Sequence, residues 1–157
     1  MKQQFINIYD SLQEIAWHFG SHGINGECCD DLSFVEFMAL KKIQYNNDYS
    51  IQELGNALNF TKSGATRIAD RLESKGYITR KNSPIDGRVC CVTSTDKGRT
   101  VITKIMENYT IYLEDILKDY EPVKIDAIRE ALFTLVNALK KGNPVNAERI
   151  GKGGECN

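Results

Sequence analysis

Apolar residues recur every three or four positions in three long stretches of the chain, the spacing that places them on one face of a helix. The stretches cover residues 3–20, 96–118 and 122–141, and we predict a helix for each, the first ending near Gly20. Their apolar faces are formed by Phe5, Ile8, Leu12, Ile15, Ala16 and Phe19; by Val101, Ile102, Ile105, Met106, Tyr109, Tyr112, Leu113, Ile116 and Leu117; and by Val123, Ile125, Ile128, Leu132, Leu135, Val136 and Leu139.

Three shorter helices are marked by capping residues in the middle of the chain. Ser33 and Ser50 are each followed three residues later by Glu, the pairing of a capping box, and Thr61 can cap the next helix. A turn at Asn59 and Phe60 separates the last two of these helices. The apolar positions expected in their core are Phe34, Phe37, Met38, Leu40 and Ile43; Ile51, Leu54, Ala57 and Leu58; and Ala65, Ile68, Ala69 and Leu72.

Two β-rich runs follow at residues 77–80 and 88–93, separated by the turn cluster NSPIDG. The predicted fold is therefore mainly α with a small β-hairpin wing, in the order helix-helix-helix-helix-strand-strand-helix-helix. A winged helix-turn-helix lobe would occupy residues 32–95, flanked by the terminal helices 3–20 and 96–141. Residues 142–157 lack apolar periodicity and are expected to form a mobile tail.

The helix that follows Thr61 has a polar face opposite its apolar stripe. Its outward residues are Ser63, Thr66, Arg67, Asp70 and Ser74. Arg can fork onto guanine and Ser or Thr can contact bases or phosphates, so this face suits a major groove. Gly64 would allow backbone to approach backbone, and Gly76 would end the helix.

At 157 residues the chain is sized for a single domain, and its net charge of −1 is unevenly distributed. Residues 61–104 hold ten Lys/Arg and four Asp/Glu, a net of +6, which leaves −7 for the remainder. The local field decides where a polyanion docks, so this segment is the candidate for double-stranded DNA. An ordinary solvated basic face is the alternative. The basic residues predicted to contact DNA are Lys62, Arg67, Arg71, Arg80, Lys81 and Arg88.

Membrane insertion and export are not expected from the sequence. No run of about 18 apolar residues occurs, and the N-terminal residues MKQQFINIYD lack a charged-then-apolar signal sequence. We therefore expect a soluble, unexported protein, which in a bacterium-like setting is cytoplasmic.

The central motifs resemble a known family of regulators. The run SGATRIADRLESKGYITR at residues 63–80, followed by Asp-Gly-Arg at 86–88 and Thr-Asp-Lys-Gly at 95–98, is similar to the MarR (multiple antibiotic resistance regulator) family. The resemblance covers residues 5–141. It implies a homodimeric transcriptional regulator, usually a repressor, that reads an inverted-repeat operator through winged helix-turn-helix lobes. The terminal helices of such a protein form the dimer.

Roles for individual residues follow from this resemblance. Ser63, Thr66 and Arg67 would read the major groove. Arg88 would enter the minor groove from the tip of the wing, and Asp86 would brace the wing through an ion pair.

The terminal helices also favour a homodimer on their own pattern. They carry more apolar surface than a small DNA-binding lobe can cover, which argues for burial against a second copy. An intramolecular helix bundle is the alternative.

Cysteine and histidine residues are candidates for sensing. His18 and His22, four residues apart, precede the pair Cys28 and Cys29, and thiolate with imidazole is a ligand set for zinc or another thiophilic metal. Cys156 could complete such a site. The alternatives are a redox-sensing thiol and purely structural cysteines. No cofactor is certain.

A second adjacent cysteine pair lies on a predicted strand. Alternation would send one of Cys90 and Cys91 inward as a small hydrophobic residue and the other outward.

The resemblance leaves the effector open, because some members of this family sense zinc, others sense oxidants, and a commoner effector is a small, often aromatic anion. Such a ligand would bind in a cleft between the dimer helices and the DNA-binding lobe. Residues that could line this cleft are Trp17, His18, Phe19, Phe37, Met38 and Tyr45, and the alternative for each is ordinary core packing.

Two other classes of function are weighed against a DNA-binding regulator. A winged-helix adaptor would work through protein contacts only, and the basic excess in 61–104 speaks against it. A thiol or metal enzyme would need a nucleophile beside a base in a shaped pocket. The sequence offers no Ser/His/Asp set, no Cys-x-x-Cys and no phosphate-binding glycine loop, so we expect no enzyme.

Overall fold

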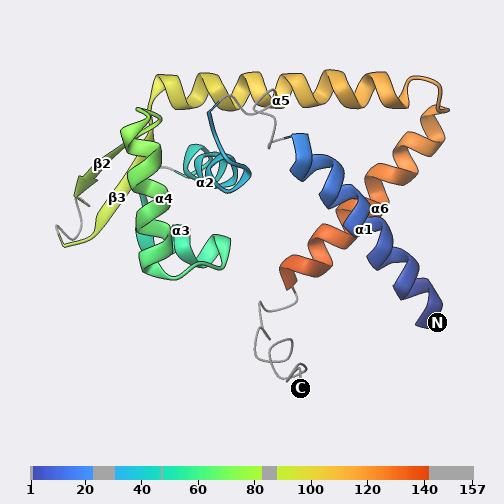
Figure 1. Cartoon of the computed structure of the whole chain (residues 1–157), viewed down its shortest axis with the longest axis horizontal. Coiled ribbons are helices and arrows are strands. Elements are labelled where there is room, and N and C mark those ends of the chain that lie inside the picture. Colours follow the sequence, from blue (N-terminus) through green and yellow to red (C-terminus); the bar gives the residue numbers. More distant parts are fainter. Residues whose placement is uncertain (1, 23–30, 47, 83–87, 142–157) are drawn as a thin grey trace. The chain divides into compact units, whose positions relative to one another are not determined.

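This computed structural model describes residues 2–22, 31–46, 48–82 and 88–141, and it has the mainly helical fold that the sequence predicts (Figure 1). The elements in chain order are α1 (Lys2–His22), α2 (Phe34–Gln44), β1 (Tyr49–Ser50), α3 (Ile51–Leu58), α4 (Lys62–Ser74), β2 (Ile78–Asn82), β3 (Cys90–Ser94), α5 (Asp96–Leu117) and α6 (Pro122–Lys141). Among the described residues, none of the helices combines the length and the apolar character needed to cross a bilayer.

The chain divides into two compact units, Met1–Ile111 and Tyr112–Asn157. The boundary falls inside α5. The first unit holds α1, the sheet, the helix-turn-helix and most of α5. The second unit contains the last turns of α5 and all of α6, none of whose residues is buried.

The long helices largely follow the predicted bounds, with one correction. α1 continues through Gly20 to His22, whereas the sequence placed its end near Gly20. A single glycine in a helix interior costs only about 1 kcal/mol relative to alanine, and that penalty does not end a helix. As a result, both histidines of the candidate sensing site lie on one helix.

The predicted helix caps are confirmed. Ser33 accepts a hydrogen bond from the Glu36 amide at 3.2 Å, and the Ser33 amide donates to the Glu36 carboxylate at 2.8 Å. The same reciprocal pair joins Ser50 and Glu53, at 3.1 and 2.8 Å. These bonds satisfy backbone donors that the first turn of a helix leaves unpaired, so each helix begins where its sequence motif places it.

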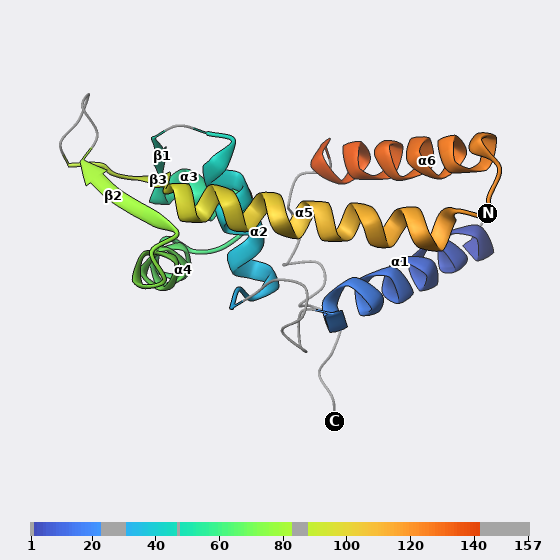
Figure 2. The same cartoon turned by 90° about the horizontal axis from the view of Figure 1, so that it is seen from above.

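The wing contains one more strand than expected. β2 and β3 form the predicted antiparallel hairpin, and β1 pairs with the other edge of β3, giving the order β1-β3-β2 (Figure 2). In this pairing Tyr49 lies opposite Val92 and Ser50 opposite Cys91. A strand of two residues is too short to show an alternation of apolar and polar positions. Ser50 also caps α3, so the sequence at this point predicted only the start of a helix.

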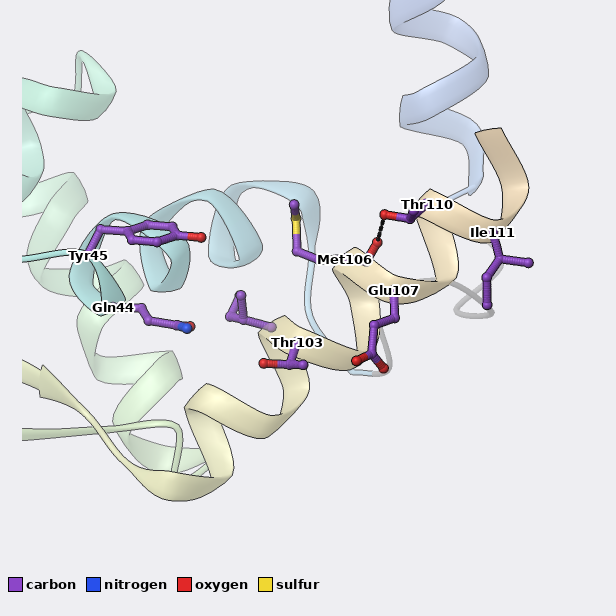
Figure 3. Close-up of a pocket in the computed structure, with 8 residues that line it drawn as sticks. Gln44, Tyr45, Thr103, Met106, Glu107, Thr110 and Ile111 are labelled. Carbon is purple, nitrogen blue, oxygen red and sulfur yellow. Dashed lines mark hydrogen bonds between the residues drawn. The ribbon is translucent and has the colours of Figure 1, made fainter. Parts of the chain in front are cut away.

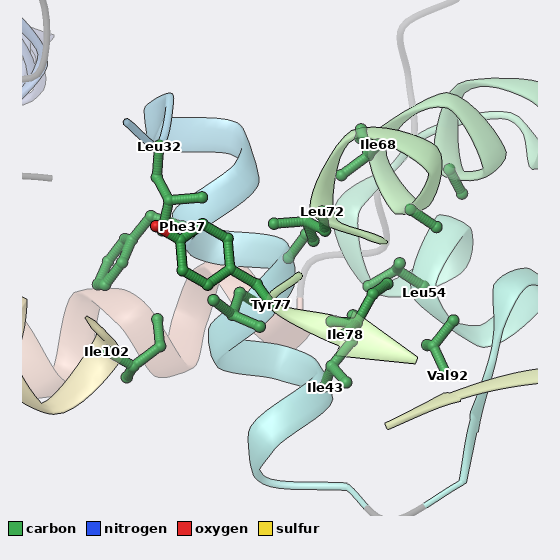
Figure 4. Packing of buried hydrophobic residues seen from close by; sticks show 14 of the residues in the cluster. Leu32, Phe37, Ile43, Leu54, Ile68, Leu72, Tyr77, Ile78, Val92 and Ile102 are labelled. Atoms are coloured by element: carbon green, nitrogen blue, oxygen red, sulfur yellow. The ribbon is translucent and has the colours of Figure 1, made fainter. Parts of the chain in front are cut away.

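The hydrophobic core of the first unit joins α2, α3, α4, the sheet and α5 (Figure 4). Of the residues predicted for it, Leu40, Leu54 and Leu72 are fully buried. Phe34 is an exception at 50% exposure, because its position in the first turn of α2 is rotated away from the line of buried residues. Ala57 is likewise exposed.

The adjacent cysteines of β3 alternate across the sheet, but neither is fully outward. Cys90 packs against the core beside Val92, while Cys91, on the other face, is only 3% exposed. The expectation of one outward cysteine was therefore wrong. Burial raises the pKa of the Cys91 thiol, and the nearby Asp48 carboxylate raises it further. A buried thiol with a raised pKa is a poor nucleophile, which favours a packing role.

Candidate nucleic-acid interface

The turn between α3 and α4 sets the geometry of the helix-turn-helix. Asn59 ends α3 in the left-handed conformation, with φ at 56°, and the Phe60 amide donates to the Gly55 carbonyl at 2.9 Å. A Cβ on Gly55 would lie 3.0 Å from the Phe60 carbonyl oxygen, whereas one on Gly64 would make ordinary contacts of 3.4 Å or more. The close approach between α3 and the turn therefore favours glycine at position 55, a contact in which Gly64 takes no part.

The end of α4 is fixed by its expected glycine. Gly76 has a φ of 77°, and its amide donates to the Glu73 carbonyl at 2.8 Å. The Tyr77 amide donates to the Leu72 carbonyl at 2.9 Å, which completes a Schellman motif. This motif turns the chain from α4 directly into the wing, so the end of the helix is joined to β2 by a short turn with fixed hydrogen bonds.

The exposed face of α4 carries the predicted reading residues. Ser63 and Arg67 are exposed, and the Thr66 hydroxyl donates to the Lys62 carbonyl at 2.9 Å. Within the described ranges, the side chains of Lys62 and Arg67 form no hydrogen bond or ion pair with the rest of the chain. Both cations are therefore available to a ligand.

Arg80, a predicted DNA contact at the start of the wing, is instead directed onto α4. Its guanidinium donates to Asp70 at 2.5 Å and lies 3.3 Å from the Glu73 carboxylate. It also approaches the Thr66 carbonyl at 3.4 Å. One guanidinium therefore offsets part of the negative charge of two carboxylates on α4.

Lys81 and Arg88 are the other two basic residues of the wing that were predicted to contact DNA. Lys81 Nζ lies 2.5 Å from Asp48, a residue with φ at 56° in the turn before β1. Arg88 is exposed in the turn two residues before β3. Asp86, which was expected to brace the wing, lies outside the described residues.

Arg71 and Lys75 converge on Glu36, whose side chain is buried at the start of α2. Arg71 Nε donates to Glu36 Oε1 at 2.7 Å, and Lys75 Nζ donates to Glu36 Oε2 at 2.9 Å. Burial alone raises the pKa of this carboxyl, but the hydrogen bonds from Ser33, Lys75 and Arg71 outweigh it and lower the pKa from 4.5 to about 2. The sequence marked Glu36 only as half of a capping box, because its cationic partners lie more than 30 residues away.

The proposed metal or redox set is only partly described. His18 lies on an exposed position of α1, and His22 is on the same helix. Cys28, Cys29 and Cys156 lie outside the described residues. The parts of the chain that the structure describes contain no cluster of three or more His, Cys, Asp or Glu suited to a metal ion.

A cavity of about 440 Å³ opens between the end of α2 and α5 (Figure 3). Of the residues predicted to line an effector cleft, Tyr45 borders it, whereas Phe37 is in the core and Phe19 packs against the Tyr109 ring. The full lining is Gln44, Tyr45, Ile102, Thr103, Met106, Glu107, Thr110 and Ile111.

Comparison with known proteins identifies the family. The model of the MarR family matches residues 32–90, which span the helix-turn-helix and most of the wing. The transcriptional repressor MprA of Escherichia coli (strain K12) is 31% identical over 114 residues, covering 69% of this chain and 65% of MprA.

Solved structures show the same fold. A MarR family protein from Bacillus stearothermophilus has a TM-score of 0.79 at 20% identity, covering 90% of this chain and 99% of that one. Streptococcus pneumoniae FabT in complex with DNA has a TM-score of 0.74 at 24% identity, covering 87% of this chain and 97% of FabT. The solved structures show the fold, and the family model and MprA show that the chain belongs to the MarR family of DNA-binding transcriptional regulators.

Proposed function

We propose that the protein is a homodimeric, sequence-specific repressor that reads an inverted-repeat operator with α4 and is released by an effector. The main support for sequence-specific DNA binding is the exposed face of α4. On this face the side chains of Ser63 and Arg67 have no intramolecular partners among the described residues. An exposed, unpaired Arg on a helix held by caps at both ends suits bidentate contact with guanine in a major groove.

The reading role is tested by Arg67→Ala on a duplex selected by the wild-type protein from a random-sequence library. Loss of one bidentate base contact should weaken binding by about 1–3 kcal/mol and relax the preference at one base pair. Fluorescence anisotropy titrations on the selected duplex and on single-base variants measure both effects.

Lys62→Ala is the matched control, because Lys62 is an equally unpaired cation five residues before Arg67 on the same helix. A phosphate contact there should weaken binding to all duplexes alike and reduce the salt slope by about 1. Unchanged base preference in Arg67→Ala would remove Arg67 from the reading face.

The homodimer is supported by apolar surface that each unit leaves exposed. In the second unit, α6 is a 20-residue helix with no buried residue. Its exposed apolar side chains include Ile125, Ile128, Leu132, Val136 and Leu139, which recur on one face. In the first unit, α1 exposes Phe5, Ile8 and Trp17. A second copy would bury these faces, and two-fold symmetry would place paired α4 helices about 34–36 Å apart on DNA.

Leu132→Arg is expected to convert the dimer to a monomer, because it places a charge at the centre of the apolar face of α6. Sedimentation should then give one chain mass instead of two, and binding to the selected duplex should fall. Thr134→Arg, on the opposite face of the same helix, should remain dimeric. A dimer that survives Leu132→Arg would contradict this interface.

The last part of the proposal is the site at which an effector binds and releases the protein from DNA. The cavity beside Tyr45 could accept a small molecule, while the His18, His22, Cys28, Cys29 and Cys156 set remains a proposal for zinc or oxidant sensing. Any of these signals would have to bind one spacing of the two α4 helices more tightly than another, since equal affinity shifts no population.

A further inference from the structure

We propose that Glu36 determines DNA specificity without contacting DNA itself. It fixes the orientation of Arg71, and it keeps Lys75 from contacting the phosphates. This inference rests on the proposed sequence-specific function. Glu36 is a positioning residue, since it would act on DNA only through the two cations of α4.

The Glu36 carboxylate is fully engaged and buried. It is 3% exposed, and its two oxygens accept from Arg71 Nε at 2.7 Å, Lys75 Nζ at 2.9 Å and the Ser33 amide at 2.8 Å. Arg71 and Lys75 are four residues apart, so they lie one helical turn from each other on α4. Arg71 lies in turn one helical turn beyond Arg67, on the same line of the helix.

Arg71 is paired with Glu36 but stays accessible to solvent. The contact with Glu36 uses its Nε, and the side chain remains 52% exposed. Its two Nη groups are the donors best placed for a phosphate. Because the guanidinium is planar, fixing Nε also fixes the direction in which these donors point. A phosphate contact made this way would hold α4 in one register on the duplex.

Lys75 is in a different position. Its Nζ donates to both Glu36 and the Asp31 carbonyl, the second at 2.5 Å, and the side chain is 25% exposed. Two of its three donors are therefore used within the protein. Non-specific affinity for DNA grows with the number of phosphates that cations neutralise. Holding Lys75 back reduces binding to every sequence without removing a contact to the bases.

The test is Glu36→Gln, which removes the charge while Gln preserves the capping box with Ser33. Affinities for a random-sequence duplex and for the library-selected duplex are measured between 50 and 300 mM salt. Release of Lys75 should tighten non-specific binding and steepen its salt slope by about 1. Loss of the fixed Arg71 should weaken specific binding, so the specific to non-specific ratio should fall by about tenfold.

Glu53→Gln is the matched control. Glu53 is the same residue at the same position of a capping box, on α3, and it contacts Ser50 rather than a cation. It removes an equal charge, so its specificity ratio should stay at the wild-type value. In the double variant Glu36→Gln/Lys75→Ala, the non-specific salt slope should return to that of wild type.

An unchanged ratio in folded Glu36→Gln would overturn the inference, as would an equal loss on both duplexes, which would show a purely structural role. Circular dichroism melting confirms that the compared variants are folded. If the wild-type protein selects no sequence from the library, the proposed function itself fails and the inference falls with it, an outcome distinct from selection with an unaltered Glu36→Gln ratio.

Discussion

Gly98→Ala is expected to unfold the protein or to destabilise it by about 3–5 kcal/mol, a large part of the 5–15 kcal/mol typical of a domain. A Cβ at Gly98 would lie 2.2 Å from the Tyr77 carbonyl oxygen and 3.1 Å from the Tyr77 carbonyl carbon. These are backbone atoms of the junction between α4 and β2, and the same oxygen accepts from the Thr95 amide at 3.0 Å. Neither side can move without breaking that junction, and urea unfolding monitored by circular dichroism measures the loss.

Gly64→Ala provides a control at the same helical position. Gly64 and Gly98 are both third in their helices, and each amide donates to a threonine hydroxyl, Thr61 at 3.1 Å and Thr95 at 3.0 Å. A Cβ on Gly64 meets nothing closer than 3.4 Å. Alanine favours a helix by about 1 kcal/mol over glycine, so this variant should be neutral or more stable. Equal destabilisation of both variants would show that the contact with Tyr77 is not the cause.

Glu36 should also govern how stability falls in acid. Its pKa is lowered from 4.5 to about 2 in the folded protein, so the ionised carboxylate stabilises the fold above pH 4.5. That contribution is lost as the pH falls through 2. We expect Glu36→Gln to be less stable than wild type by about 2 kcal/mol at pH 7, allowing for solvent around Arg71 and Lys75.

The difference between the two proteins should narrow as the pH is lowered from 4.5 towards 2, because protonated Glu36 and Gln then carry the same charge. Urea unfolding at pH 7, 4.5, 3.5 and 2.5 follows the gap. A gap that stays constant over this range would mean that the ion pairs with Arg71 and Lys75 contribute nothing to stability.

The ion pairs also change how the basic segment is understood. Its net charge of +6 suggests a uniformly positive surface, but Arg71, Lys75, Arg80 and Lys81 are all paired with carboxylates. Exposed ion pairs contribute little to stability, so their main effect here should be on the field that DNA meets. We infer that a few unpaired cations, Lys62 and Arg67 among them, carry much of the attraction.

The sequence by itself determined the features that depend on neighbours three or four residues apart. Both capping boxes, the turn at Asn59, the end of α4 at Gly76 and the buried stripe of that helix are set by such local contacts. They were predictable because the same residues that specify the backbone also satisfy its hydrogen bonds. Helical periodicity also placed Ser63, Thr66 and Arg67 on the outward face of α4, and the family resemblance then implied that they read the major groove.

Only the tertiary structure decided which groups meet across long separations. Arg71 lies 35 residues from Glu36, Lys81 lies 33 from Asp48, and Gly98 packs on a backbone carbonyl 21 residues before it. The burial of Cys91 was missed for the same reason, whereas β1 was missed because two residues are too few to show alternation. The conformation of a residue is encoded by its neighbours in the sequence. Its long-range contact partner, in contrast, depends on how helices and strands pack. This packing separates the cations that are free to bind DNA from those that are paired within the protein.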